Sequence, residues 1–240
     1  MTAGSARALI VGVGGLGCPA AMALARAGVA VLGLCDDDLV ERTNLHRQIL
    51  FDDRDVGQPK VEAAARALKN RTPGLEVRQH AHRLLPENAT DLVRQYDIVL
   101  EGSDNFATKF LTADACQLAR VPVVHASAVR WIGTAMAVAA RGRPCYRCLF
   151  EDIPPGGALN CAAAGVMGPV VGIVAAIQVD LALALLAGEP VAGEIATFDG
   201  RTDVLRRRSL LPRADCSLCG RPSRIQRIDP GAYVSPADAG

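Results

Sequence analysis

A glycine-rich hexapeptide, GVGGLG beginning at Gly12, constrains the fold of this chain more than any other segment. It follows an apolar run, Ala8–Val11, and precedes an Ala-rich segment, Cys18–Ala27. Gly12, Gly14 and Gly17 fit the pattern G-x-G-x-x-G, in which glycines let the backbone turn tightly and approach a phosphate group. The start of the chain therefore predicts a strand, a nucleotide-binding turn and a helix.

Strand-like and helix-like segments then alternate along the first half of the chain. Further strands are expected at 29–35, 76–80, 98–100 and 123–126, and helices at 61–69, 88–95 and 106–119. This alternation predicts a mostly parallel sheet with right-handed crossovers, which places the loops after the strands at one edge of the sheet. Apolar content of 50% with only 4% aromatic residues fits the same α/β class.

The pattern changes after residue 130, where strands are expected at 133–139, 195–199 and 202–207. The predicted fold is thus a Rossmann-like, doubly wound, largely parallel sheet that antiparallel strands continue, with a structural zinc site towards the C-terminus. We expect one domain over residues 1–220. Its nucleotide-binding part covers about 8–130, its zinc and crossover-loop part covers about 131–220, and a flexible tail follows at 221–240.

One apolar segment, Val166–Ala187, is long enough to span a bilayer. Gln178 and Asp180 lie near its middle, and a central Asp costs roughly 3 kcal/mol on insertion scales. We therefore expect a helix buried in the core or at a subunit interface, and no membrane association. A net charge of +1 argues against a nucleic-acid partner. Eight cysteines without a convincing signal peptide favour a reducing compartment, and we expect a cytoplasmic protein.

Charged residues distinguish two kinds of nucleotide. Asp36 lies 19 residues after Gly17, at the end of the next expected strand, where a carboxylate can bind ribose hydroxyls. Together with the glycine turn alone, this spacing favours NAD. Arg47 and Lys60 add cations that suit a triphosphate, and Asp104 is placed to hold magnesium.

Each of these charges also has a simpler interpretation. Arg47 and Lys60 could be solvated loop charges, Asp37 and Asp38 could be surface carboxylates, and Asn105 could serve only as a helix cap. The charges cluster at the ends of three expected strands, and this arrangement favours ATP over NAD.

Eight motifs occur in an order that resembles the ThiF/MoeB/HesA family, bacterial relatives of the ubiquitin-activating enzymes. They are GxGGxG, D-x-D, NLxRQ, QPK, a strand-end DN, CYRC, NC-x-x-x-GV-x-GP and a late CxxC. The resemblance covers about residues 8–220, and the details DDD, HRQILF, NCAAAGVMGPVVG and FDG look closest to ThiF.

The family resemblance implies ATP-dependent adenylylation of the C-terminal glycine of a ubiquitin-like sulfur carrier, with release of pyrophosphate. For the ThiF branch the carrier is ThiS-like and serves thiamine biosynthesis. Three alternatives stay open: the same chemistry on a molybdopterin-synthase carrier (MoeB-like), an NAD-dependent oxidoreductase, and a nucleotide-binding scaffold without turnover.

The resemblance also implies functional residues and partners. Nucleotide contacts fall on Gly12, Gly14, Gly15, Gly17, Asp36, Asp38, Thr43, Asn44, Leu45, His46, Arg47, Lys60, Asp104 and Asn105. Catalytic roles fall on Arg47, Lys60, Asp104 and Cys161, with ATP as cofactor and Mg²⁺ at Asp104. A homodimer and a cysteine desulfurase or rhodanese as sulfur donor are further expectations.

Two departures from the family pattern concern cationic side chains. The relatives usually begin with a helical segment that gives an arginine to the partner subunit's site, and Arg7 does not match that arginine. Lys109 stands where the family usually has arginine, which weakens any bidentate role at that position.

The cysteines fall into two groups. Cys145 with Cys148 and Cys216 with Cys219 form two CxxC pairs, which predict a structural zinc site with four thiolates; a redox pair is the alternative. The family has zinc at these four positions. Cys161 stands apart in a Pro/Gly-rich segment. The resemblance implies that it captures the activated carrier, whereas the simpler interpretation is a small packing residue.

Overall fold

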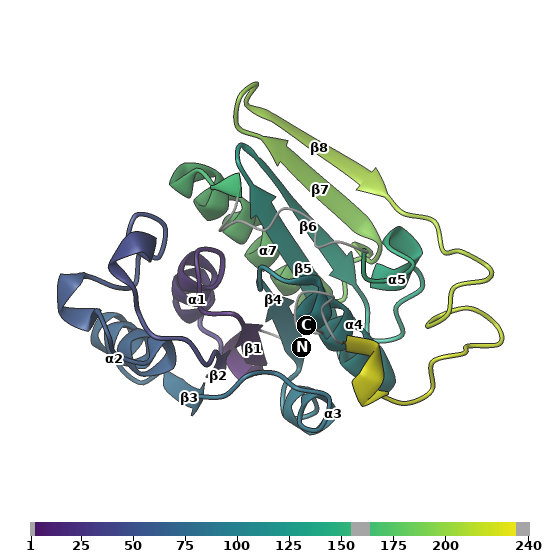
Figure 1. Ribbon diagram of the computed structural model, residues 1–240, viewed down its shortest axis with the longest axis horizontal. Helices are drawn as coiled ribbons and strands as arrows, with labels where there is room; N and C mark the ends of the chain where they lie inside the picture. The colour runs from purple at the N-terminus through teal and green to yellow at the C-terminus, as the bar shows by residue number, and fades with distance from the viewer. Residues whose placement is uncertain (1–2, 155–163, 234–240) are drawn as a thin grey trace.

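The computed structural model describes residues 3–154 and 164–233, and an eight-stranded sheet forms its centre (Figure 1). The strand order is β3-β2-β1-β4-β5-β6-β7-β8. The strands are β1 (Arg7–Val11), β2 (Val31–Cys35), β3 (Glu76–His80), β4 (Ile98–Glu101), β5 (Val123–Val129), β6 (Ile132–Val138), β7 (Glu194–Asp199) and β8 (Val204–Ser209). The pairings from β3 to β5 are parallel, and those from β5 to β8 are antiparallel. The predicted fold class is confirmed.

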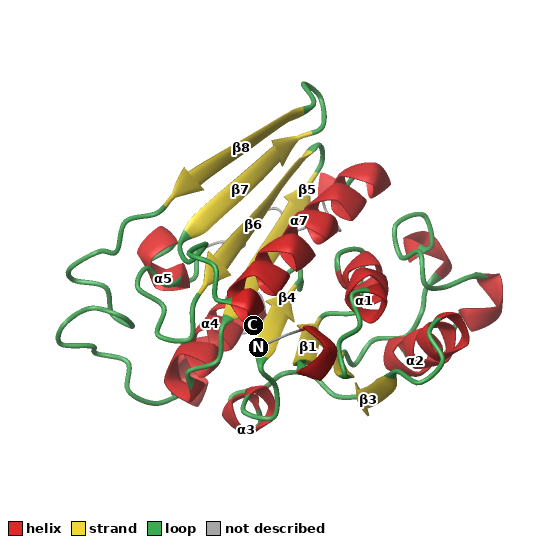
Figure 2. Cartoon of the chain, turned by 180° about the vertical axis from the view of Figure 1, so that it is seen from behind, coloured by secondary structure: helices red, strands yellow, loops and turns green. Residues whose placement is uncertain are grey.

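Helices cover both faces of the sheet (Figures 1 and 2). They are α1 (Gly17–Arg26), α2 (Lys60–Arg71), α3 (Ala89–Val93), α4 (Phe106–Ala119), α5 (Tyr146–Leu149) and α7 (Gly168–Ala187). Residues of α1, α2 and α7 share one hydrophobic cluster with the sheet, and residues of α3, α4 and α5 share the other. Strands β1, β2 and β4 are apolar on both faces because helices cover both sides of a parallel sheet.

The long apolar helix α7 passes a length and composition test for a membrane span, but it packs against the sheet. Gln178, at its middle, is 1% exposed and donates to the carbonyls of Glu101 (2.9 Å) and Val124 (2.8 Å). Gly133 on β6 leaves no room for a Cβ because the Val174 side chain of α7 occupies that space. These contacts agree with the expectation of a core helix.

The C-terminal segment is described as far as Tyr233, where it contacts α4. Tyr233 is 9% exposed, and its hydroxyl donates to Oδ2 of Asp114 on α4 (2.7 Å). Ser223 also donates to the carbonyl of Leu218 (2.8 Å). In this structure the segment 221–233 therefore contacts α4, because the buried Asp114 carboxylate accepts a hydrogen bond from Tyr233.

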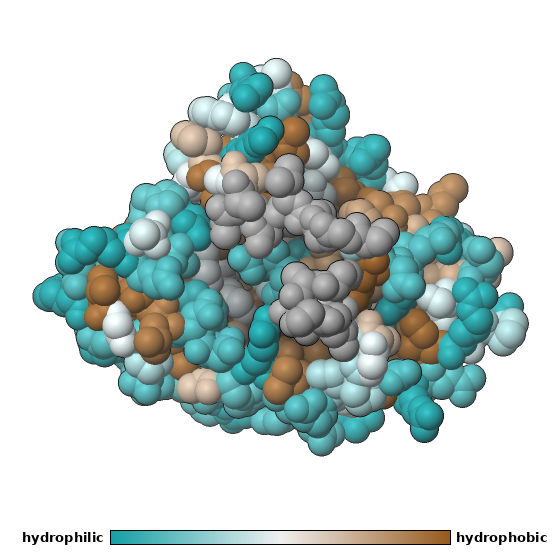
Figure 3. All heavy atoms as spheres, in the orientation of Figure 1, coloured by the Kyte–Doolittle hydropathy of each residue, from teal (hydrophilic) through white to brown (hydrophobic). Residues whose placement is uncertain are grey.

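Strands β3 and β8 form the two edges of the sheet. The edge strand β8 carries three consecutive exposed arginines, Arg206, Arg207 and Arg208. Figure 3 shows hydrophilic residues interspersed with hydrophobic ones on this part of the surface. Arg207 pairs with Asp180 of α7 (3.6 Å) and with Glu194 of β7.

Candidate nucleotide and metal sites

A cavity of about 870 Å³ opens at the carboxyl ends of the parallel strands. Its wall comes from the segments after β1, β2, β4 and β5 and from α7. Ligands of doubly wound folds bind at this edge of the sheet. The predicted nucleotide residues on the wall are Gly12, Gly14, Gly15, Asp36, Asp38, Asn44, Arg47, Lys60, Asp104 and Asn105.

The glycines of the turn serve different purposes. Gly12 has a φ of +88°, which favours glycine, and a Cβ there would lie 3.1 Å from the backbone nitrogen of Ser103. Gly17 is not on the cavity wall, and a Cβ there would overlap the carbonyl oxygen of Gly12. Gly15 lines the cavity, where a Cβ would lie 3.3 Å from the Arg47 side chain. The turn thus exposes backbone without side chains to the cavity.

Asp36 holds the turn as well as lining the cavity. Its Oδ2 accepts from the Val13 N–H (2.7 Å), and its Oδ1 accepts from the Asp38 N–H (2.9 Å). Burial raises the pKa of this carboxyl group, although Lys60 acts in the opposite direction. The carboxylate therefore fixes the segment after β2 against the turn after β1, beside the space for a nucleoside.

Lys60, at the start of α2, is 6% exposed and is therefore not a solvated loop charge. Its Nζ lies 2.6 Å from Oδ2 of Asp38 and 3.9 Å from Oδ1 of Asp36. Burial disfavours the charged amine, but the two carboxylates outweigh burial and raise the pKa of Lys60. The cavity wall therefore includes an ammonium group whose charged form is favoured by two carboxylates, and such a group suits a phosphate.

Arg47 provides a second cation on the wall. Its Nη2 donates to Oδ1 of Asn44 (2.5 Å), which orients the guanidinium group. Gln48, the next residue, is 3% exposed and also lines the cavity, although it was not among the predicted site residues.

Three predicted residues of the same segment do not reach the cavity wall: Thr43, Leu45 and His46. Thr43 donates to Glu41 (3.2 Å), His46 contacts the Thr43 carbonyl (3.0 Å), and Leu45 packs against the core. In this structure they shape the loop that carries Arg47.

Asp104 and Asn105 follow β4 and line the cavity together. Asn105 Oδ1 accepts from the Thr108 N–H (2.8 Å), so this residue caps α4 as well. Asp104 is exposed, and its carboxylate makes no hydrogen bond or ion pair with the residues that the structure describes. A carboxylate in this state can bind a divalent cation.

A buried ion pair beneath Asp104 was not predicted. Glu101, at the end of β4, is 0% exposed and lies 2.8 Å from Lys109 Nζ. Its other oxygen accepts from the N–H (2.7 Å) and the hydroxyl (2.5 Å) of Ser103. Burial opposes ionisation, but Lys109 and His125 outweigh burial and lower the pKa of Glu101 to about 2. A Glu and a Lys inside apolar runs, eight residues apart, were the only signal in the sequence.

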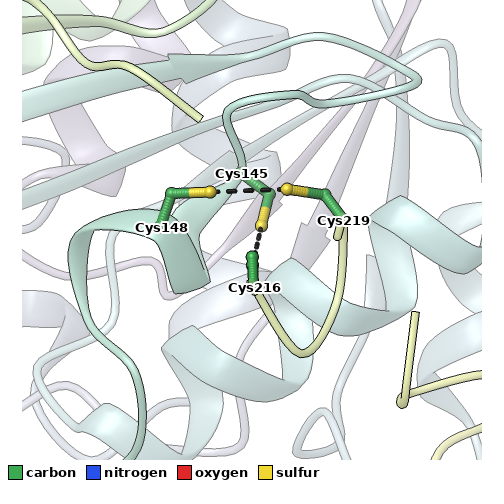
Figure 4. A group of neighbouring side chains, drawn as sticks. All are labelled: Cys145, Cys148, Cys216 and Cys219. Carbon is green, nitrogen blue, oxygen red and sulfur yellow. Dashed lines mark hydrogen bonds between the residues drawn. The ribbon is translucent and has the colours of Figure 1, made fainter. Parts of the chain in front are cut away.

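The two CxxC pairs converge on one cluster (Figure 4). Sγ of Cys145 lies 3.6 Å from that of Cys216, and Sγ of Cys148 lies 3.4 Å from that of Cys219. All four sulfur atoms lie within 4.8 Å of one another, and the cysteines are free. Sulfurs around a tetrahedral zinc ion, with bonds of about 2.3 Å, lie about 3.8 Å apart. The cluster could therefore hold zinc, and it would join the segments after β6 and β8. Cys161 lies outside the described residues.

The fold and the cavity define a nucleotide-binding α/β protein with a four-cysteine cluster. A model of the ThiF family matches residues 2–219, and the chain belongs to this family. The resemblance found in the sequence is confirmed. Membership of this family does not support the NAD-dependent alternative.

Two relatives illustrate the similarity. "Adenylyltransferase and sulfurtransferase MOCS3" of Sus scrofa is 44% identical over 228 residues, covering 93% of this chain and 50% of the relative. The protein of that name from Aedes aegypti is 39% identical over 232 residues, covering 95% and 53%. The chain thus spans about half the length of these relatives.

Among solved structures, E. coli MccB with ATP matches with a TM-score of 0.79. The match covers 91% of this chain and 68% of MccB, at 23% identity. At this identity the likeness supports the fold alone.

Proposed function

We propose that this chain uses ATP to adenylylate the C-terminal glycine carboxylate of a ubiquitin-like sulfur-carrier protein, with release of pyrophosphate. The observation that carries the proposal is the pairing of two cations, Lys60 and Arg47, with a bare glycine turn on one cavity wall. Membership of the ThiF family and relatives named adenylyltransferases support it.

The chemistry needs positioning and charge neutralisation rather than a general base, because a carboxylate is already a nucleophile. The carrier carboxylate attacks the α-phosphorus, and pyrophosphate leaves. Lys60 and Arg47 stabilise charge on the phosphate oxygens, and Asp36 binds the ribose. Asp104 would hold Mg²⁺, which neutralises the leaving pyrophosphate when bound.

The choice of carrier rests on two different observations. The motif details that resemble ThiF favour a ThiS-like carrier of thiamine biosynthesis. The relatives named MOCS3 favour the second candidate, a MoeB-like role with a molybdopterin-synthase carrier. In either case Cys161 would capture the activated carrier, and a cysteine desulfurase or rhodanese would supply sulfur. We also propose a homodimer, in which a partner subunit could complete the cationic site.

Carrier-dependent exchange of pyrophosphate into ATP tests the proposal. Purified ThiS-like and MoeB-like carriers are added in turn, with a variant of each that lacks the terminal glycine as control. We expect exchange with one intact carrier and none with its truncated form. ATP binding without exchange for every carrier would favour the non-catalytic scaffold. The preferred carrier decides between the two pathways.

A further inference from the structure

Glu101 holds in place the turn that carries Asp104. This carboxylate is fully buried and does not line the cavity, so it cannot touch a nucleotide there. Through one oxygen it accepts both the N–H and the hydroxyl of Ser103, and these two bonds bend the chain directly after β4. The bend places Ser103, Asp104 and Asn105 on the cavity wall.

Lys109 holds Glu101 in its charged form. Its Nζ lies 2.8 Å from Glu101 Oε2 and donates to the carbonyl of Ala126 on β5 (2.7 Å). From the opposite face of the sheet, Gln178 donates to the carbonyls of Glu101 and Val124. The end of β4 and the first half of β5 are therefore held by α4 on one side and by α7 on the other.

The same turn supports the glycine turn. At Gly12 a Cβ would lie 3.1 Å from the Ser103 nitrogen and 3.2 Å from the Gly102 carbonyl carbon, so the two backbones touch. A shift of Ser103 would thus disturb the glycine turn as well as Asp104. Without Lys109, Glu101 would keep Ser103 and His125 Nδ1 (3.2 Å) as hydrogen-bond partners but would lose its nearest cation. A buried carboxylate that loses its cation is favoured to take up a proton.

We propose that Glu101 and Lys109 are positioning residues, whose buried ion pair holds the Ser103–Asn105 turn so that Asp104 presents its carboxylate to the cation of the bound nucleotide. The inference rests on the proposed function for the identity of that ligand. The ion pair between Glu101 and Lys109 does not depend on the proposed function.

Four variants of the full-length chain test this role. Glu101→Gln removes the charge at a residue that does not reach the cavity and is therefore the decisive variant. Lys109→Met removes its partner, which itself lines the cavity. Lys109→Arg keeps a cation at this position. Asp114→Asn is the matched control, because Asp114 is also 0% exposed and pairs with a cation, Arg147 (2.8 Å), away from the turn.

Three measurements distinguish a positioning role of the ion pair from a purely stabilising role. They are the Mg²⁺ concentration for half-maximal pyrophosphate exchange, the KM for the carrier, and hydrogen–deuterium exchange of the peptide that covers residues 102–108. In Glu101→Gln and Lys109→Met we expect the half-maximal Mg²⁺ concentration to rise about 10- to 100-fold, as for other residues that orient metal ligands. The peptide should exchange faster while the carrier KM stays unchanged. Lys109→Arg should restore the half-maximal Mg²⁺ concentration and the deuterium exchange of this peptide to wild-type values. Asp114→Asn should lower only the Tm.

The proposal is overturned if Glu101→Gln leaves both the Mg²⁺ dependence and the exchange of this peptide at wild-type values. It is equally overturned if Asp114→Asn changes them as much. Failure of the proposed function is seen separately, as absence of pyrophosphate exchange in the wild-type protein. In that case deuterium exchange and calorimetric affinity for MgATP still decide whether the ion pair positions the turn.

Discussion

At the scale of single residues, the site combines a buried cation, Lys60, with exposed charges such as Asp104. Lys60 carries its ammonium group at 6% exposure between Asp36 and Asp38. Its position, 13 residues after Arg47, gave no hint of burial, because a Lys at a helix start usually lies in solvent. The two carboxylates that neutralise it explain why it is tolerated there.

Replacement of Lys60 by Met should weaken ATP binding by about tenfold or more, since a factor of ten corresponds to about 1.4 kcal/mol. The phosphates lose a cation, and Asp36 and Asp38 are left without their partner. Isothermal titration calorimetry measures the Kd. Lys69→Met, an exposed position on the same helix, is the control and should bind ATP like the wild type. Equal affinity for the two variants would remove Lys60 from the phosphate site.

Asp104→Ala should abolish carrier-dependent pyrophosphate exchange while the Tm stays within about 1 °C of the wild type. The exposed carboxylate has no described protein partner to lose, and surface substitutions of this kind usually change stability by less than about 0.5 kcal/mol. Exchange assays and circular dichroism check the two parts. Full exchange activity in Asp104→Ala would show that the metal assignment is wrong.

At the scale of elements, hydrophobic patterning predicted the strands and long helices because both faces of the parallel strands are covered by helices. Boundaries moved by a few residues, as at β8, which begins at Val204 rather than at residue 202. Patterning could not reveal Gln178 on the carbonyls of β4 and β5, or Tyr233 on Asp114. Such contacts join residues far apart in the sequence, so no local spacing encodes them.

The prediction of the site residues has the same limit: topology can be predicted from the sequence, and individual side-chain contacts cannot. Ten of the residues that the motifs predict for the site line the cavity, because strand ends and the glycine turn converge by topology. Motif spacing did not distinguish Arg47 from its neighbours Thr43 and His46, which do not line the cavity. Side-chain direction in an irregular loop follows from its hydrogen bonds, and these are not visible in a motif.

The four-cysteine cluster yields a prediction for α5 and the segment after β8. Cys216→Ser should remove about one zinc per chain and lower the Tm by about 10 °C or more, because structural zinc contributes binding energy directly to folding. Metal analysis and differential scanning calorimetry measure the two effects. Cys18→Ala, at a buried free cysteine on α1, is the control and should keep its metal. The zinc site would be contradicted if the wild-type protein contained no metal and had the same Tm as Cys216→Ser.

At the scale of the whole molecule, a ligand that binds the folded state should stabilise all of it. ATP at about 100 times its Kd should contribute about 2.7 kcal/mol, which raises the Tm of a chain of this size by roughly 5–10 °C. NAD at the same concentration should have no effect. Thermal shift measurements with both nucleotides check this, and a larger shift with NAD would favour the oxidoreductase alternative.

The arginines of β8 have a consequence for assembly. An exposed edge strand offers unpaired backbone groups that could join the sheet of another molecule. Two copies that met edge to edge at β8 would bring Arg206, Arg207 and Arg208 against the same three residues of the partner, and the like charges would repel. This edge therefore opposes sheet extension between molecules and protects the chain against aggregation by that route. A homodimer of this protein should form through another surface.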